Sequence, residues 1–367
     1  MSVPQLERVQ PGQSVWGLPH VPAWCEGCSR GWMVPSSQQG ALCGCGAAKL
    51  QASSVAVPVG GPEGLVAAKV ERVDLPDRIE EYFKGVKWRD KDVKPAALAQ
   101  RAVQVWWPRY LVDSGVVGTF QVEVGFDYEA QSSIERYAGN SWVTEKRVEW
   151  RIRWEARVGK LRRRYDNITV SAVRDQDDLP GGDSQHSELS AFDPVAVNEQ
   201  RLQVPDLSPT ESWGEAEPSF RRMAGEDVQR AVQGQHVRDV HVSADFPDQH
   251  WTLMLQPMWM TWYKTDSGEV LPIVIDAVDG EVVGSVLAGY TWAWIWGGLL
   301  AVSGATLLFL SLVGAVLCLF FPPAIAIPIV FFVFGVIILG LSVAPFLSVR
   351  WWNLRQRALA KQLRRQT

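Results

Sequence analysis

Four of the five cysteines lie close together near the N-terminus, in a spacing that is typical of a metal site. Two residues separate Cys25 from Cys28, one residue separates Cys43 from Cys45, and fourteen residues lie between the pairs. Two close pairs joined by a short loop let four thiolates converge on one tetrahedral ion. Residues 21–50 are therefore predicted to form a zinc ribbon, with Zn as the cofactor and these four cysteines as its ligands.

The sequence leaves other interpretations of this segment open. A zinc knuckle usually has at least two residues between its cysteines, so His20 is an alternative ligand. The stretch WCEGC superficially matches a thioredoxin active site, although no strand is predicted before it and no βαβ pattern surrounds it. Unliganded thiols would leave the segment with little to fold around, and iron is an alternative metal. Cys318 lies in an apolar run and is interpreted as a small apolar residue.

Catalytic motifs are missing from the sequence. It contains no GxSxG elbow, no HExxH, no dinucleotide-binding glycine pattern and no GxxxxGK[ST] phosphate loop. The five histidines, at positions 20, 186, 236, 241 and 250, are scattered along the sequence. We therefore expect a protein that is not an enzyme.

Two apolar runs near the C-terminus predict a transmembrane hairpin over residues 291–349. Residues 293–321 and 324–349 contain no charged residue, and each run exceeds the roughly 20 residues that span a bilayer as a helix. Only Pro322 and Pro323 separate the runs, so a tight turn joins them. The alternative is a pair of buried helices in a soluble core, but such helices usually carry charge on one face.

Flanking residues predict the orientation of this hairpin. Tryptophans occur at 292, 294 and 296, where the first run begins, and at 351 and 352 after the second, as in an interfacial aromatic belt. The tail, residues 350–367, has six basic residues and no acid; because the chain's net charge is −4, the rest of it is near −10. The positive-inside rule then predicts an inner-membrane protein with both termini in the cytoplasm and reduced cysteines.

Period-two alternation around residues 120–128 and 148–158 predicts antiparallel strands with one buried and one wet face. Helices are predicted near residues 77–86, 96–105, 194–199 and 219–233, and further strands near 251–263, 270–278 and 281–286. The fold class is therefore α+β.

The sequence divides into eight predicted units. They are an N-terminal tail (1–20), the zinc ribbon (21–50), a linker (51–72), a first α+β half (73–174), an acidic loop-rich connection (175–235), a second β-rich half (236–290), the transmembrane hairpin (291–349) and a basic amphipathic tail (350–367).

Two proline-containing segments, VWWPRYLVDSG and LQPMWMTWYKTDSG, are similar to each other. Because proline removes a backbone donor, a strand through Pro108 or Pro257 is expected to lie at a sheet edge or to open at that residue. The similarity suggests an internal duplication, with chance similarity as the alternative. The core is then predicted to be filled by Trp106, Trp107, Trp259 and Trp262.

A family resemblance rests on an ordered set of segments. The CxxC ribbon, WWPRYLV, LSAFDPVAV, VPDLSPTESW and LQPMWMTWYKTDSGEVLPIVIDAVDGEVVGS precede the apolar helices in that order. This order resembles bacterial zinc-ribbon (TFIIB-type) two-pass membrane proteins. The resemblance implies a membrane-tethered cytoplasmic scaffold, and some members are linked to membrane-stress systems of the phage-shock and flotillin-like kind.

Two clusters are candidate contacts for anionic lipid headgroups or a partner, with a solvated sheet face and a simple stop-transfer tail as the alternatives. They consist of Arg151, Arg153, Arg157, Arg162, Arg163 and Arg164, and of Trp351, Trp352 and Arg355 in the tail.

We expect a membrane-anchored adaptor that recruits protein partners. A homo-oligomer of this chain is one possible assembly. The alternatives are an oligomeric channel or membrane-remodelling protein built on the hairpin, and a zinc-dependent regulator that contacts RNA. Nucleic-acid binding is not expected, because Trp150 and Trp154 alternate away from the arginines.

Overall fold

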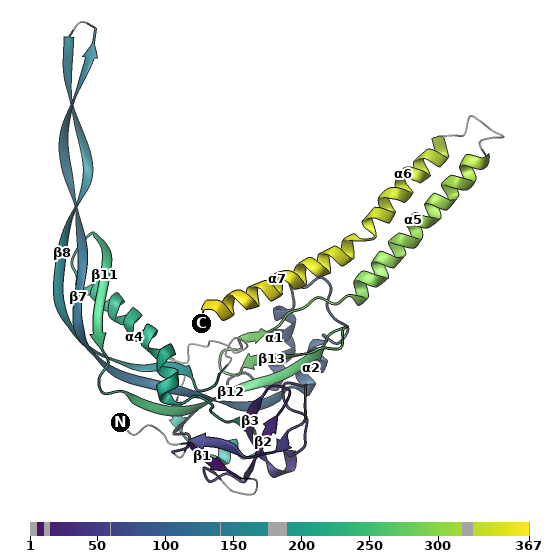
Figure 1. Ribbon diagram of the computed structural model, residues 1–367, viewed down its shortest axis with the longest axis horizontal. Helices are drawn as coiled ribbons and strands as arrows, with labels where there is room; N and C mark the ends of the chain where they lie inside the picture. Colours follow the sequence, from purple (N-terminus) through teal and green to yellow (C-terminus); the bar gives the residue numbers. More distant parts are fainter. Residues whose placement is uncertain are drawn as a thin grey trace.

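The computed structural model describes residues 6–10, 15–58, 60–139, 141–174, 189–317 and 326–366 (Figure 1). It has an α+β fold with a large sheet, as the sequence predicts. Several sequence predictions fall outside the described residues, namely the role of Cys318, the Pro322-Pro323 turn and the acidic stretch 175–188.

A 12-stranded sheet forms the body. Its main path runs in the order β14 (Val282–Gly284), β13 (Val270–Asp276), β12 (His250–Lys264), β7 (Val103–Ala138), β10 (Arg201–Gln203), β3 (Arg30–Pro35), β2 (His20–Cys25) and β4 (Gln51–Ala52). Off this path, β8 (Ser141–Ser171) and β11 (His236–Asp245) pair with β7, β6 (Gly64–Val66) pairs with β12, and β9 (Leu189–Ala191) pairs with β6. A separate two-stranded sheet joins β1 (Leu6–Val9) to β5 (Val55–Pro58).

The helices lie around this sheet and at the C-terminus (Figure 1). They are α1 (Leu75–Tyr82), α2 (Pro95–Arg101), α3 (Pro194–Val197), α4 (Pro209–Ala231), α5 (Thr291–Leu317), α6 (Ala326–Leu341) and α7 (Ala344–Gln366), with short 3-10 turns at Ser36–Gln38 and Arg72–Asp74. All four predicted soluble helices form, with shifted ends. The largest shift is in α4, which begins at a capping box between Ser208 and Glu211 that satisfies its first amides.

Segments that the sequence divides into separate units join in this one sheet. The predicted ribbon contributes β2 and β3, the first half contributes β7 and β8, and the second half contributes β11 to β14. The segment 51–72, predicted to be a linker, instead contains the three short strands β4, β5 and β6. Strands this short carry too few residues for a periodic signal, and their pairing is set by distant partners.

The two similar proline segments pair with each other at the centre of the sheet. Antiparallel β7 and β12 are in register from Val103 opposite Met260 to Asp113 opposite His250. Trp106, Trp107 and Trp259 are buried as predicted, whereas the fourth tryptophan, at position 262, is half-buried. The similar segments are therefore neighbours in one sheet, and the internal duplication stays a prediction.

Each proline lies where the outer neighbour of its strand changes. β7 is paired with β10 before Pro108 and with β8 after it. β12 is paired with β6 before Pro257 and with β13 after it. Proline has no N–H to donate, so it fits a point where its strand has no paired residue on the outer side, away from the β7–β12 pairing. The predicted openings are confirmed, although both strands are interior rather than edge strands.

Beyond the body, β7 and β8 continue as a long two-stranded arm, which we define as residues 126–138 and 141–153 (Figure 1). At its root a third strand, β11, pairs with β7 as far as Gly125, and helix α4 covers one face through Phe220 and Val228. Both elements touch only the base of the arm among the described residues: the His236 Nε2 of β11 lies 2.9 Å from Oδ1 of Asp127, and Phe126 packs against the cluster that includes Phe220. The rest of the arm extends past them (Figure 1). The prediction of a buried face on β8 is therefore wrong here: Trp150 is 70% exposed and Val148 is 54% exposed. Alternation specifies a strand, but not what covers its apolar side.

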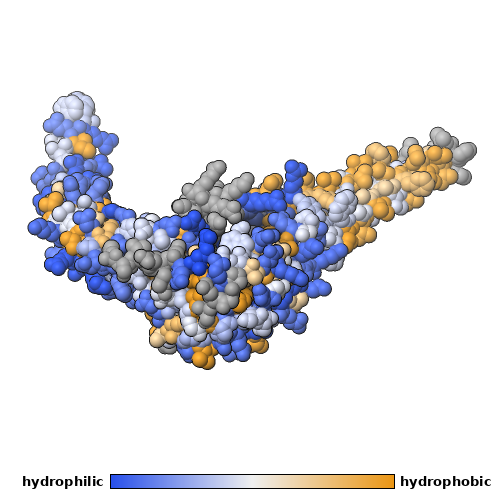
Figure 2. All heavy atoms as spheres, turned by 60° about the horizontal axis from the view of Figure 1, so that its bottom comes forward, coloured by the Kyte–Doolittle hydropathy of each residue, from blue (hydrophilic) through white to orange (hydrophobic). Residues whose placement is uncertain are grey.

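Helices α5 and α6 form the two long apolar helices expected of the hairpin, and they are the hydrophobic limb of the molecule (Figure 2). The candidate membrane spans are Thr291–Leu317 and Ala326–Ala358, and in each an apolar 18-residue stretch is only 11% buried inside the protein. The buried residues of α5 are small and spaced four or seven apart: Ala293, Gly297, Gly304 and Ser311. Gly304 and Ser311 contact α6, whereas Gly297 lies against Ser342 and Phe346 and Ala293 belongs to the core of the body. Small residues let two membrane helices approach closely without a cavity.

Helix α7 folds back onto the body and ties the helical limb to the sheet. Val349 is fully buried, and the side chain of Asn353 exchanges two hydrogen bonds with the backbone of Ala288, at 2.7 and 3.0 Å. The indole of Trp88 donates to Ser348 at 3.0 Å. The connection between anchor and body is thus a packed interface rather than a flexible linker.

A buried carboxyl lies at this junction. Asp90 is 3% exposed; its Oδ1 accepts from the amide of Asp266, and its Oδ2 has no hydrogen-bond partner among the described residues. The carboxylate of Asp266 in turn accepts from the amide of Thr291, where α5 begins. Burial, reinforced by the nearby Asp266 charge, raises the pKa of Asp90 to about 6.

Gly304→Ala should destabilise the helix pair, because its Cβ would lie 2.8 Å from the Leu339 nitrogen and 3.0 Å from the Gly335 carbonyl oxygen. Overpacking against backbone costs about 1–3 kcal/mol, measured as the free energy of unfolding in detergent. Gly298→Ala is the matched control on the same helix, since its Cβ would meet nothing within 4 Å. Equal stability of the two variants would contradict this packing.

Asp90→Asn should stabilise the protein at neutral pH. The pKa of Asp90 is raised from 3.8 to about 6 on folding, so the protonated form is favoured in the native state. The wild type is therefore destabilised relative to the Asn variant as pH rises from about 4 to about 6, by about 2–3 kcal/mol in all, and the difference is constant at higher pH. Urea unfolding from about pH 3.5 to pH 8 measures this difference. An unchanged gap between the two proteins over that range would show that Asp90 titrates normally.

Candidate metal centre

The first cysteine pair lies on a β-hairpin turn. Strand β2 ends at Cys25, which pairs with Arg30 at the start of β3, and Cys28 lies in the turn between them. The second pair lies on a tight turn that runs back along the first: Gly46 donates to the Cys43 carbonyl at 2.9 Å. Because Gly46 has φ +75, it adopts the left-handed conformation that lets this turn close after a single intervening residue.

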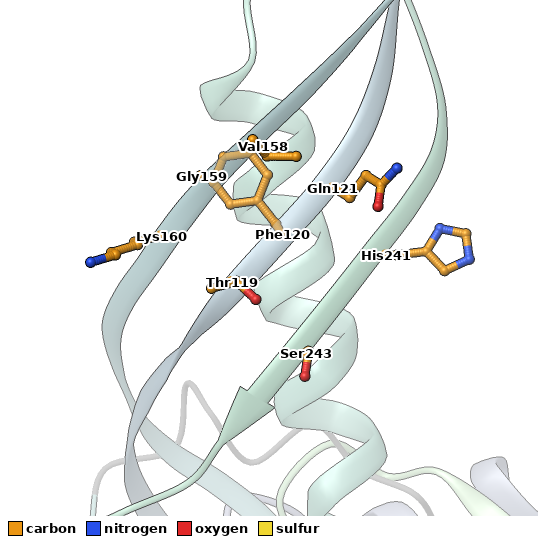
Figure 3. Close-up of a pocket in the computed structure, with 8 residues that line it drawn as sticks. All are labelled: Thr119, Phe120, Gln121, Val158, Gly159, Lys160, His241 and Ser243. Atoms are coloured by element: carbon orange, nitrogen blue, oxygen red, sulfur yellow. The ribbon is translucent and has the colours of Figure 1, made fainter.

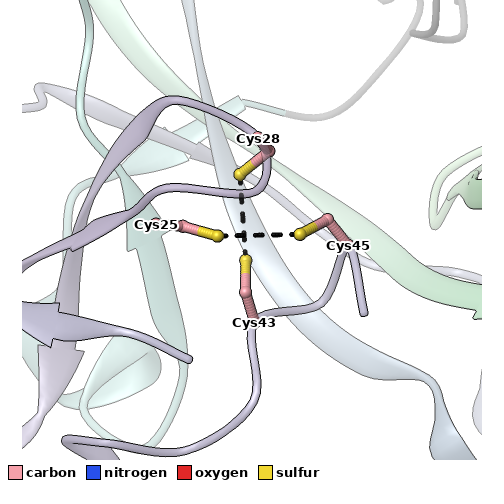
Figure 4. A group of neighbouring side chains, drawn as sticks. All are labelled: Cys25, Cys28, Cys43 and Cys45. Atoms are coloured by element: carbon pink, nitrogen blue, oxygen red, sulfur yellow. Dashed lines mark hydrogen bonds between the residues drawn. The ribbon is translucent and has the colours of Figure 1, made fainter. Parts of the chain in front are cut away.

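The four sulfurs converge on one point (Figure 4). The Sγ atoms of Cys25 and Cys45 are 3.7 Å apart, those of Cys28 and Cys43 are 3.9 Å apart, and all four lie within 4.8 Å of one another. Four sulfurs arranged tetrahedrally at the usual Zn–S distance of about 2.3 Å are about 3.8 Å apart. The irregular spacing of the second pair therefore does not prevent a tetrahedral donor set, and the cluster can bind a metal ion.

This cluster is part of the main core rather than a separate module. Cys25, Cys43 and Cys45 are buried among residues of the central strands, including Trp107 of β7 and Met258 of β12. The second turn lies directly on β12: a Cβ at Gly44 would lie 2.9 Å from Met260, and one at Gly46 would overlap the Trp262 ring. A metal held here would also fix β2 and β3 against the centre of the sheet.

The thiols strongly perturb one another. Hydrogen bonds from the other three thiols, with Cys28 the largest contributor, hold the pKa of Cys25 well below its ordinary value. The contact with Cys25 raises the pKa of both Cys28 and Cys43. At Cys45 the contact with Cys25 raises the pKa, but those with Cys28 and Cys43 outweigh it and lower the pKa to about 7. Four thiolates in contact repel one another, and a divalent cation removes that repulsion.

The alternatives for this segment can now be compared with the geometry. His20 is not part of the cluster, because its Nε2 donates to the Gln200 carbonyl at 2.8 Å and its ring is buried elsewhere. A strand does precede Cys25, contrary to expectation, but an antiparallel hairpin follows instead of a thioredoxin helix. A donor set of four cysteines with no open ligand position is typical of structural metal sites.

The structure does not gather the predicted arginine cluster into one patch. Arg151, Arg153 and Arg157 lie along β8 and form ion pairs with Glu149 or Glu155 at 3.0 to 3.5 Å. Arg163 reaches Asp227 of α4, Arg164 pairs with Asp166, and Arg162 is exposed at the root of the arm. Surface ion pairs of this kind contribute little to stability. The residues therefore belong to different surfaces of one long hairpin.

The tail residues also separate. Trp352 was expected to face lipid, but its indole donates to the Val286 carbonyl and its ring packs against the body, because α7 folds back. Trp351 is 62% exposed, and the guanidinium of Arg355 lies 5.5 Å from its ring. Only Trp351 and Arg355 of this predicted group point outward.

A shallow hollow of about 530 Å³ lies at the root of the arm across β7, β8 and β11 (Figure 3). Its polar lining includes Lys160, His241 and Ser243. The Nδ1 atom of His241 donates to the Asp239 carbonyl of its own strand. The hollow therefore offers polar side chains, but its histidine is held by the backbone and is not aimed at a nucleophile.

Sequence reasoning missed two features of the surroundings. The exposure of the arm tryptophans has no local signal, because the same alternation occurs in covered strands. The buried carboxyls of Asp90 and Asp276 also have no local signal, although Asp276 lies inside a predicted strand, where an acid is uncommon.

None of the protein-family models, curated proteins or solved structures compared with this chain matches it. The resemblance to the zinc-ribbon membrane proteins stays a prediction.

Cys28→Ser should abolish metal binding, because three thiolates leave the tetrahedron incomplete. Elemental analysis of the purified protein is expected to give a single bound ion per chain for the wild type and almost none for the variant. Thermal unfolding should show a clear loss of stability that chelator reproduces in the wild type. Cys318→Ser is the control cysteine outside the cluster and should retain the metal. Equal metal content in all three proteins would contradict the site.

Proposed function

We propose that this protein is a membrane-anchored scaffold, in which the apolar helices hold the sheet at the inner membrane and the arm binds protein. The observation that carries this proposal is the arm itself. It projects from the body as a limb separate from the apolar helices (Figure 1), and no described element packs over its exposed aromatic side chains. Exposed apolar side chains grouped in this way mark interaction sites.

The packed junction supports a scaffold rather than a tethered, freely moving domain. Trp88, Val349 and Asn353 join α5 and α7 to the body, so the arm has a defined position relative to the membrane. A partner that binds the arm is thereby held at a fixed height above the bilayer. With both termini in the cytoplasm, that partner is a cytoplasmic or membrane protein.

The hairpin itself favours an anchor over a conducting channel. Helices α5 and α6 contain no ionisable residue. Two of the hydroxyls on α5, those of Ser303 and Thr306, donate to carbonyls of the same helix, at 2.8 Å each. Residues that line ion pathways are usually ionisable or polar. Their polar groups face the pathway instead of donating hydrogen bonds to carbonyls of their own helix.

We assign zinc to the cysteine cluster, as a structural ion in a ribbon built from β2 and β3. The support is the sulfur spacing, which matches a tetrahedron with Zn–S bonds of about 2.3 Å. The role of the ion in this proposal is to keep the far side of the sheet folded, so that β7 is fixed at the point from which the arm projects.

Affinity purification of the full-length protein in mild detergent tests the proposal. Mass spectrometry and native mass should reveal a specific bound protein, either a different chain or further copies of this one. The double variant Trp142→Ser/Trp150→Ser should lower its recovery at least about tenfold, because both side chains are exposed on the arm. Zinc content should be unchanged.

Val195→Ser is the matched control for this experiment, because Val195 is 80% exposed but lies on α3, away from the arm. Its recovery of the bound protein should equal that of the wild type. A wild-type protein that is monomeric and partner-free would contradict the scaffold, as would equal recovery with both variants.

A further inference from the structure

The arm has two faces of different composition. Alternate residues of a strand point to opposite sides, and directly paired residues share a side. We call one side the tryptophan face; its apolar side chains come from β8 and from the end of β7: Trp142, Val148, Trp150, Ile152 and Tyr137. We call the other side the arginine face; its apolar side chains come from β7: Phe126, Tyr128 and Ile134.

Charges are sorted between these faces with opposite sign. The tryptophan face carries Asp127, Glu129 and Glu135 against one base, Lys146. The arginine face carries Arg136, Arg147, Arg151 and Arg153 against Glu145 and Glu149. The formal charges are therefore −2 and +2, and the arm as a whole is neutral. A face of this arm is electrostatically complementary to the opposite face of an identical arm.

A two-stranded ribbon of this length needs a covering partner. Isolated hairpins are marginal in water, and a third strand or a packed layer is needed for independent stability. Along the arm neither is present among the described residues, yet Tyr128, Ile134, Trp142 and Trp150 are 45 to 70% exposed. The partner must therefore offer apolar surface to both faces.

The area of one face sets the strength of such a contact. Thirteen residue pairs extend about 45 Å, and two strands are about 10 Å wide, so each face offers roughly 450 Å². Two faces in contact bury roughly 900 Å², less than the about 1,200 Å² of a stable interface in solution. Anchoring in one membrane raises the effective concentration of copies and gives all arms the same orientation.

We propose that the arm binds a second copy of this chain, with the tryptophan face of one arm packed on the arginine face of the next. This inference rests on the proposed scaffold function and names its arm-bound protein. Because the two surfaces differ, the contact is heterologous and each copy has a neighbour on both sides, which builds rings or rows at the membrane. The ribbon twist carries both faces around the arm (Figure 1), so neighbouring arms coil about each other.

The charges argue against an anionic lipid surface as the occupant of the arm. Lipid headgroups attract segments with an excess of basic residues. The arm has as many acids as bases, and the acids lie on the face with the most tryptophan. The tryptophan face, which is negatively charged, would therefore be repelled by an anionic bilayer. The same face would be attracted by the positively charged arginine face of another arm.

Cysteine cross-linking in membranes tests the contact. Gln131 and Ala130 are neighbours on β7 that point to the tryptophan and arginine faces, respectively. Full-length chains with Gln131→Cys or Ala130→Cys, in a Cys318→Ser background and with tags of different mass, are expressed singly or together. Treatment with a short bismaleimide should link the mixed pair at least about fivefold more than either variant alone. The Cys318→Ser parent is the background control.

Each outcome has a distinct meaning. Preferential mixed linkage supports the heterologous contact. Linkage of either variant mainly with itself overturns it. Linkage only to a different protein overturns the second copy as occupant but leaves the scaffold function standing. An arm that links to no protein overturns both, and protection of the cysteines by vesicles of anionic lipid would assign the arm to the membrane.

Charge reversal gives a second measurement that does not depend on folding of a damaged arm. Glu129→Lys changes the formal charge of the tryptophan face from −2 to 0, and Arg151→Glu changes that of the arginine face from +2 to 0. Each should lower mixed linkage at least about fivefold, because the attraction between unlike faces is lost. The double variant leaves both faces without net charge and should stay as weak as the singles. If the singles or the double variant link as well as the wild type, the charge pairing is wrong.

Discussion

The antiparallel pairing of β7 with β12 is the interaction on which the rest of this structure depends. The turns that carry the cysteines pack against Met260 and Trp262 of β12. Pro108 and Pro257 mark the points at which the outer neighbours of β7 and β12 change. Strand β7 then leaves the sheet to form the arm, while β12 leads through β13 and β14 to the apolar helices. The cysteine cluster, the apolar helices and the arm therefore all depend on a single pair of strands, and a shift in its register would move all three.

Features that depend on neighbouring residues were predictable from the sequence. Cysteine spacing indicates convergent thiols because tight turns place their sulfurs together, and long uncharged runs indicate spanning helices because of bilayer thickness. The strand openings at Pro108 and Pro257 follow from the missing N–H. Helix α4 was found in its second half only, because Pro209 and the capping box that begin it lie in a segment that reads as loop.

Features that depend on distant partners were not predictable. The ribbon, both predicted halves and the supposed linker join in one sheet, and nothing local in residues 51–66 specifies the partners of its short strands. The alternation of β8 correctly indicates a strand, but burial of Trp150 would need a covering layer that exists only at the root of the arm, where α4 lies. Trp352 turns inward because α7 folds back onto Val286, a contact between residues 66 positions apart.

We propose that protein covers the arm when the chain is in its membrane. Hydrogen exchange of the arm amides distinguishes a covered arm from a bare one. It is measured by mass spectrometry on the full-length protein in native membrane vesicles and again on the detergent-solubilised monomer. A two-stranded ribbon without a cover opens readily, so its amides exchange fast. We expect slow exchange across residues 126–138 and 141–153 in membranes and fast exchange in the monomer, with the root beside α4 slow in both. Fast exchange of the arm in both states would contradict it.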